Sequence, residues 1–169
     1  MGKLPIKSGL ARNPLTNAEF QSVNDWTKKE WDRLSRESKF PVCLKLANGD
    51  YRVATFRVQW NNIWWSVFNT YNEQIAEFTT EAGAVVFCIL QHKGKYYEAQ
   101  QLADLDAKVV RLRQDKVLFR RMLTTAHDKN DGWGIDLYTS RFKDNAAQLS
   151  TAQVELNKII KTTKYYKII

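Results

Sequence analysis

Residues 42–78 read VCLKLANGDYRVATFRVQWNNIWWSVFNTYNEQIAEF, and this stretch decides the fold. Apolar and polar residues alternate from Val42, and Asn48-Gly49 predicts a hairpin turn because both residues tolerate positive φ. The alternation resumes at Tyr51 and predicts one strand up to Trp60. Turns at 61–62 and 71–74 then separate a strand over 63–70 from a short strand over 75–78. The stretch therefore predicts an antiparallel meander of three or four strands.

The same alternation assigns side chains to the two faces of the predicted sheet. On the strand 51–60, one face is expected to carry Ala54, Phe56, Val58 and Trp60, and the other Tyr51, Val53, Thr55, Arg57 and Gln59. On the next strand, Trp64 and Phe68 oppose Trp65 and Val67. One of these two pairs is expected in the core, and the sequence leaves open which face of the sheet is covered.

Helical patterns surround the meander. Thr16 and Glu19 form a capping box that predicts a helix over 17–38. Thr80 is expected to cap a short apolar helix over 81–92, which His92-Lys93-Gly94 ends. The C-terminal part predicts helices over 96–126, 133–145 and 151–162, with a break at 130–132 and a cap at Ser150. The predicted class is α+β, with a flexible basic arm (1–15), an α+β domain (16–94) and a helical region (95–169) that packs on it or extends from it.

Composition excludes several classes of protein. The chain of 169 residues carries a formal charge of +8, and a hydrophobic content of 44% excludes disorder over most of its length. Two cysteines, Cys43 and Cys88, cannot make a disulfide scaffold or a four-cysteine zinc site, and both are expected to be buried and inert. The apolar run 82–90 is too short to span a bilayer, and residues 1–15 lack the apolar centre of a signal peptide. We therefore expect a soluble, cytoplasmic protein, free or virion-associated, without a membrane partner.

Residue patterns for catalysis and for metal binding are not found in the sequence. His92 and His127 are the only histidines, and neither has a second ligand at metal-binding spacing. The segment from Asp128 fails as a calcium loop because Gly132 is fifth and Thr139 is twelfth. No phosphate-binding glycine motif occurs. We expect no enzymatic activity, no metal and no cofactor.

The aromatic and basic residues of 51–71 are the first candidate binding site. Arg52 and Arg57 accompany Trp60, Trp64 and Phe68, and exposed aromatic rings beside arginines stack on unpaired bases with about 1–3 kcal/mol per base. The alternative is a sheet with helices on both faces, in which all the aromatic residues are core.

Two further basic segments extend this candidate site. Arg113, Lys116 and Arg120 recur at i, i+3 and i+7 and so share one face of the long helix, where they would neutralise phosphates or form an ordinary solvated surface. The C-terminal tail combines basic and aromatic residues, namely Lys158, Lys161, Lys164, Lys167, Tyr165 and Tyr166. The arm at 1–15 carries three bases and no acid, and it is either a phosphate-binding tail or a solubilising terminus.

Three resemblances accompany these patterns. A helix, three strands and a helix over 16–92 are similar to the double-stranded-RNA-binding domain, but Thr79-Thr80-Glu81-Ala82 stands where that family has a basic cluster, which argues against double-stranded RNA. Four strands and a helix over 42–92 resemble the Whirly and transcription-coactivator type of single-stranded-DNA-binding fold. This likeness is topological and extends to Arg52, Arg57, Trp60 and Trp64 as sheet residues. The segment 149–159 (LSTAQVELNKI) resembles a helical segment that recurs in phage and DNA-metabolism proteins.

Two functional hypotheses follow from the sequence. The first is a non-enzymatic nucleic-acid-binding protein that prefers single-stranded DNA or RNA and uses the sheet aromatics, the basic arm and the basic helix. The second is a structural or assembly protein, such as a small phage or virion component, whose aromatic residues are core. In this second case the C-terminal helices would bind a protein partner or a second copy of the chain.

Overall fold

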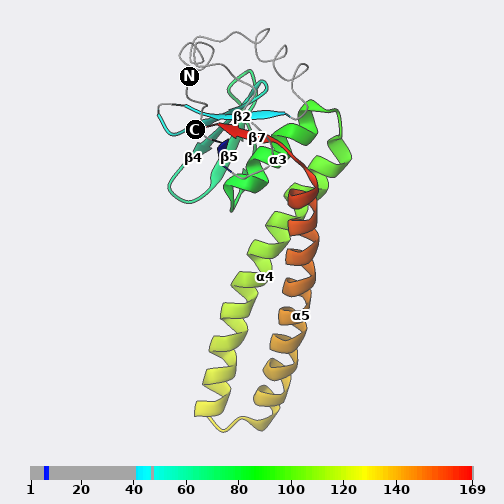
Figure 1. Cartoon of the computed structure of the whole chain (residues 1–169). Coiled ribbons are helices and arrows are strands. Elements are labelled where there is room, and N and C mark those ends of the chain that lie inside the picture. Colours follow the sequence, from blue (N-terminus) through cyan, green and yellow to red (C-terminus); the bar gives the residue numbers. More distant parts are fainter. Residues whose placement is uncertain (1–5, 8–40, 47, 169) are drawn as a thin grey trace. The chain divides into compact units, whose positions relative to one another are not determined.

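The computed structural model describes residues 6–7, 41–46 and 48–168 (Figure 1). The helix expected over 17–38 lies outside these residues, as does most of the arm 1–15. The chain divides into two compact units, of which the first comprises residues 1–103 and 160–169 and the second comprises residues 104–159. The first unit holds a sheet and a covering helix, and the second is a helical hairpin, so the fold class is α+β.

The sheet is an antiparallel meander that is extended at one edge by two further strands, of which the first is parallel to its neighbour in the meander. The meander consists of β2 (Val42–Lys45), β3 (Tyr51–Val53), β4 (Phe56–Trp60), β5 (Trp65–Phe68) and β6 (Gln74–Phe78). β7 (Tyr166–Ile168) pairs parallel with β2, and β1 (Ile6–Lys7) pairs antiparallel with β7. The meander is confirmed, and it has five strands where the sequence predicted three or four.

The additional strand arises at Ala54, and it corrects the predicted faces. Residues 51–60 form two strands joined by a tight turn, in which Ala54 has a φ of 52° and Val53 lies opposite Phe56. Alanine rarely adopts this left-handed conformation, because it costs about 1–2 kcal/mol. An alanine in the sequence therefore does not indicate a turn. The turn puts Tyr51 and Val53 on the same face as Phe56, Val58 and Trp60, whereas Arg52, Arg57 and Gln59 lie on the other face.

The turn at Asn48-Gly49 forms as predicted, between β2 and β3. Gly49 has a φ of 91° and donates its N–H to the Leu46 carbonyl at 3.1 Å, and Leu46 donates to the Asp50 carbonyl at 2.7 Å. A Cβ at position 49 would meet no atom within 4 Å, so only the backbone conformation requires glycine.

We expect Gly49→Ala to lower the free energy of unfolding by about 1–2 kcal/mol, because an L-residue is strained at this φ. Gly132→Ala is the matched control, since Gly132 also has open space around its Cα but stands at the start of a helix. Urea unfolding followed by circular dichroism is expected to show unchanged or higher stability for the control. Equal destabilisation of the two variants would contradict the assigned turn.

Helix α3 (Glu81–His92) covers one face of the meander and packs against β3, β4, β5 and β6 (Figure 1). The core under it is formed by Val53, Val58, Val67 and Phe78 of the sheet, whose Phe78 ring lies 5.2 Å from that of Phe87. The Thr80 hydroxyl accepts a hydrogen bond from the Gly83 N–H at 3.1 Å, and Gly94 follows the helix with a φ of 73°. The predicted cap and the predicted end of this helix are confirmed.

Both cysteines lie in the core of the first unit, as expected. Cys43 and Cys88 do not form disulfides and are fully buried. Burial raises the pKa of the Cys88 thiol well above its ordinary value, so this thiol stays protonated and unreactive.

The second unit is a hairpin formed by α4 (Tyr96–Asp128) and α5 (Gly132–Thr162). Apolar side chains fill the seam between the helices, including Leu105, Val109, Leu112, Leu149, Ala152 and Leu156. Within this seam the Asn145 side-chain amide donates to the Leu112 carbonyl at 3.0 Å. The predicted break is confirmed, because Asn130 has a φ of 51° and the Asp131 carboxylate accepts the Gly134 N–H at 3.0 Å.

Two C-terminal predictions are wrong. The helices expected over 133–145 and 151–162 are one helix, and Ser150 lies inside it, because the intervening NAAQLSTAQ contains no glycine or proline and serine costs a helix interior little. Residues 166–168, which were expected in the helical region, form β7 beside β2. Their aromatic and β-branched side chains favour a strand, and the ladder of β2 supplies the hydrogen-bond partners.

Candidate nucleic-acid interface

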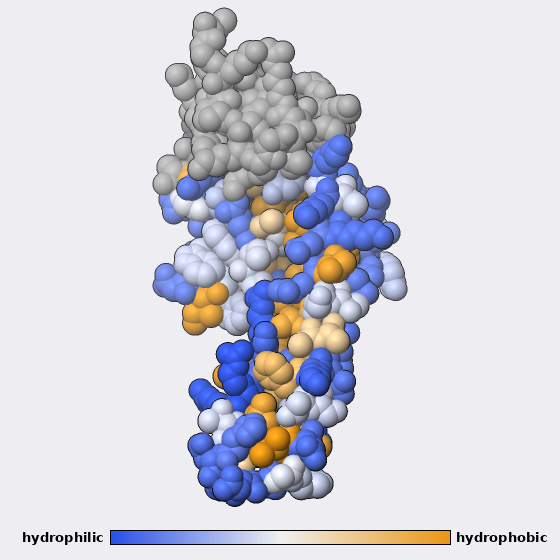
Figure 2. All heavy atoms as spheres, turned by 60° about the horizontal axis from the view of Figure 1, so that its bottom comes forward, coloured by the Kyte–Doolittle hydropathy of each residue, from blue (hydrophilic) through white to orange (hydrophobic). Residues whose placement is uncertain are grey.

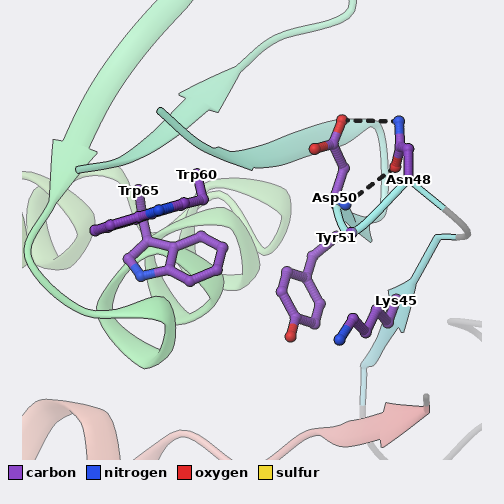
Figure 3. A pocket seen from close by; sticks show the side chains of 7 residues that line it. Lys45, Asn48, Asp50, Tyr51, Trp60 and Trp65 are labelled. Atoms are coloured by element: carbon purple, nitrogen blue, oxygen red, sulfur yellow. Dashed lines mark hydrogen bonds between the residues drawn. The ribbon is translucent and has the colours of Figure 1, made fainter. Parts of the chain in front are cut away.

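An aromatic cavity of about 380 Å³ opens beside the meander (Figure 3). Three rings line it from three neighbouring strands, namely Tyr51 of β3, Trp60 of β4 and Trp65 of β5. Trp60 and Trp65 are direct cross-strand partners with ring centroids 5.2 Å apart, and the Tyr51 ring lies 5.7 Å from Trp65 in an edge-on arrangement. Trp60 is 45% exposed, so one indole of the cavity is open to a ligand.

The turn between β2 and β3 forms the polar side of this aromatic cavity. The Asn48 side chain accepts the Asp50 N–H at 3.0 Å and donates its amide to the Asp50 carboxylate at 3.2 Å. Lys45 is the direct cross-strand partner of Tyr51 and is exposed, so its ammonium group supplies a positive charge beside the rings. The cavity thus combines stacking surface with one cation.

Tyr51 is fixed in the cavity wall by helix α3. Burial raises the pKa of the Tyr51 hydroxyl well above its ordinary value, and a hydrogen bond to the Glu81 carboxylate raises it further. The phenol therefore stays neutral and donates to Glu81, which stands in the first turn of α3. This bond connects the ring to the helix that covers the sheet.

The opposite face of the meander carries an arginine cluster, which we define as Arg52, Arg57 and Phe68. Arg57 is the direct partner of Arg52 on one side and of Phe68 on the other. Its guanidinium lies 4.9 Å from the centre of the Phe68 ring and donates to the Asn72 side-chain oxygen at 2.9 Å. A second cavity of about 260 Å³ is lined by all three residues of the cluster.

Asp50 contributes to the sites on both faces of the sheet. It lines the aromatic cavity, and its carboxylate lies 4.0 Å from the Arg57 Nε. Burial lowers the pKa of the Arg52 guanidinium, which nevertheless remains charged at neutral pH. The turn after Gly49 therefore positions groups for both cavities.

The structure separates residues that the sequence grouped together. Trp60 lies on the face covered by α3, whereas Arg57 and Phe68 lie on the other face, and the turn at Ala54 puts Arg52 there as well. Trp64 lies in the loop before β5, half-buried, and its backbone N–H donates to the Asn61 side-chain oxygen at 2.7 Å. The sequence did not single out Lys45, Tyr51 and Trp65 as site residues. Recognising a hairpin within 51–60 would have placed Tyr51 on the face of Trp60.

The basic residues of the predicted helix lie in the second unit. Lys116 and Arg120 of α4 both approach the Phe142 ring of α5, at 6.0 and 5.8 Å from its centre, and Arg113 is exposed. Lys161 and Lys164 are exposed near the end of α5, and Lys167 lies in β7. Tyr165 is buried, so the tail does not present this ring as a binding surface, which corrects the interpretation of the tail for Tyr165.

The described part of the chain holds neither a cluster of metal-ligating side chains nor a helix that could span a membrane. It contains no group of three or more His, Cys, Asp or Glu side chains that would hold a metal ion. None of its helices is both long enough and apolar enough to cross a membrane.

Comparison with known proteins gives no relative from which a function could be transferred. No protein-family model, no curated protein and no solved structure matches the chain. The geometry of the two cavities and the distribution of charge are therefore the basis for a functional proposal.

Proposed function

We propose that this chain is a non-enzymatic nucleic-acid-binding protein that binds single-stranded DNA or RNA through its sheet unit. The observation that carries the proposal is the aromatic cavity, which the half-exposed Trp60, its partner Trp65 and the cationic Lys45 line together. Flat rings next to a cation match an unpaired base and its phosphate. A paired base offers no free face to such a cavity, so the geometry favours single strands.

The arginine cluster supports the same proposal from the other face of the sheet. Two guanidinium groups and a phenyl ring share one cavity there, and Arg57 is held in place by Phe68 and Asn72. Such a group binds phosphates and stacks on bases. Further phosphate contacts are proposed for the basic residues of the helices and the C-terminal segment, which are Arg113, Lys116, Arg120, Lys161, Lys164 and Lys167.

The test is a tryptophan-fluorescence titration with single-stranded and duplex oligonucleotides at low and high salt. We expect Trp60→Ala to weaken single-strand binding about tenfold, because an alanine cannot stack on a base. Trp133→Ala is the matched control, since this 74%-exposed indole belongs to the helical hairpin, and it is expected to keep wild-type affinity. Equal affinities of wild type and Trp60→Ala, or tighter binding of duplex, would overturn the proposal.

The salt dependence of oligonucleotide affinity distinguishes the contributions of the two cavities. The double variant Arg52→Gln/Arg57→Gln is expected to reduce the slope of log affinity against log salt by about one for each phosphate that the protein no longer neutralises. Trp60→Ala is expected to leave this slope unchanged, because an indole releases no counterions.

A second candidate function is that of an assembly protein. It is favoured by apolar side chains that the helical hairpin leaves in solvent, among them Val117 at 52% and Leu118 at 47% exposure. A stable oligomer whose tryptophan fluorescence does not respond to any oligonucleotide would favour this function over nucleic-acid binding.

A further inference from the structure

One side of the helical hairpin leaves apolar residues uncovered. On α4, Asp115, Leu118 and Met122 recur at i, i+3 and i+7 and so share one side of the helix. Leu118 is 47% and Met122 is 36% exposed. Hydrophobic side chains are visible along the hairpin between polar ones in Figure 2. Two helices alone cannot bury this surface.

Helix α5 contributes to the same side. Leu137, Arg141 and Asp144 recur at i, i+4 and i+7, and a cavity of about 280 Å³ is lined by Asp115 together with Arg141 and Asp144. The cavity shows that these rows of α4 and α5 adjoin. We call the six residues Asp115, Leu118, Met122, Leu137, Arg141 and Asp144 the hairpin face.

The charges of the hairpin face indicate what can cover it. It carries two aspartates and one arginine around its leucines and methionine, so it offers both signs of charge. An isologous contact between identical chains requires such self-complementarity, because each residue meets the same patch of the other copy. The side of the hairpin with Lys116 and Arg120 around Phe142 is basic and would repel its own copy.

The side of the hairpin that carries the hairpin face is large enough to bind a second copy. Each arm of the hairpin is about 40 Å long at 1.5 Å per residue, and two adjacent helices are about 20 Å wide. This whole side measures about 800 Å², which equals what each partner contributes to a stable interface, and the hairpin face, within 115–122 and 137–144, covers about 12 Å of its length. Two hairpins packed face to face form a four-helix bundle, which is a common arrangement of amphipathic helices.

We infer that the hairpin face docks on the same face of a second copy of this chain, so that the two hairpins form an isologous four-helix bundle. In this dimer Leu118, Met122 and Leu137 of both copies form a shared apolar core. Arg141 of each copy meets the aspartates of the other. The basic side around Phe142 remains exposed in both copies.

The test is light scattering on the full chain after nuclease treatment, in high salt. The wild type is expected at twice the chain mass of 19.7 kDa, and Leu118→Glu/Met122→Glu at the single mass. Val117→Glu/Val154→Glu is the control, because these valines are also exposed on the hairpin but lie off the hairpin face, and it is expected to stay dimeric. Circular dichroism at 222 nm checks that both variants remain helical.

Three results would overturn the inference. A monomeric wild type at about 100 μM would show that the face is free or takes a different protein, since this concentration exceeds the dissociation constants of ordinary specific interfaces. A dimeric Leu118→Glu/Met122→Glu variant would place the interface elsewhere. Loss of the dimer on nuclease treatment would mean that nucleic acid bridges the two copies.

Discussion

Replacing Phe78 by alanine is expected to lower the free energy of unfolding of the sheet unit by about 3–5 kcal/mol. Among the residues that the structure describes, Phe78 is the largest fully buried side chain, and its ring packs against Phe87 of the covering helix. Its removal leaves a cavity at the junction of β6 and α3 that neither element can close without moving. Domains of this size have a total stability of about 5–15 kcal/mol, so the decrease is a large part of the whole.

The control for this variant is Phe68→Ala, on the opposite face of the same sheet. Phe68 is half-buried and contacts the Arg57 guanidinium, so its removal is expected to cost about 1 kcal/mol. Urea unfolding followed by tryptophan fluorescence measures both variants, because the indoles of Trp60 and Trp65 belong to this unit. A similar decrease in stability for the two variants would contradict the assignment of the covered face.

Replacing Asn145 by aspartate is expected to destabilise the helical hairpin by about 3–5 kcal/mol at pH 7. Asn145 is 4% exposed and donates its side-chain amide to the Leu112 carbonyl, while its own oxygen has no partner. A carboxylate at this position cannot donate, and it would bury a negative charge against that carbonyl oxygen. Thermal unfolding at 222 nm measures the destabilisation.

The destabilisation by Asn145→Asp is expected to depend on pH through the pKa of the new carboxyl group. Burial would raise the folded-state pKa of an aspartate at position 145 above its unfolded value of about 3.9. The destabilisation therefore sets in as pH rises above about 3.9, and it is absent in more acidic solution, where a protonated carboxyl can donate to Leu112. Asn145→Leu, of similar volume, is the control and is expected to be near neutral at every pH, because it leaves no unpaired oxygen. Equal stability of the aspartate and leucine variants at pH 7 would contradict the buried position.

Local signals account for the parts of the fold that could be predicted. Asn48-Gly49 and Thr80 act through their own backbone and side-chain geometry, so each could be recognised from a few residues. The meander and the long helix follow from periodicity in the same way. The helix start predicted at Ser150 was wrong because a serine that can cap a helix is also tolerated inside one.

The remaining features depend on strand pairing that no local sequence signal marks. β7 forms because β2 offers it a ladder, and nothing within residues 166–168 marks the partner. Ala54 takes a strained turn that the pairing of Val53 with Phe56 maintains. This turn puts Arg52 beside Arg57 and Tyr51 on the face of Trp60, so the candidate residues could be named from the sequence but not all assigned to their two cavities.

The pairing of β2 with β7 has a consequence for how the sheet is completed. Val42 and Tyr166 lie opposite each other although they are about 120 residues apart in the chain, which is a contact of high sequence separation. The helical hairpin lies between them in sequence, and formation of this hairpin removes most of the freedom of the intervening chain. We expect the hairpin to form first, from local contacts, so that closing the sheet across β2 and β7 then becomes a short search.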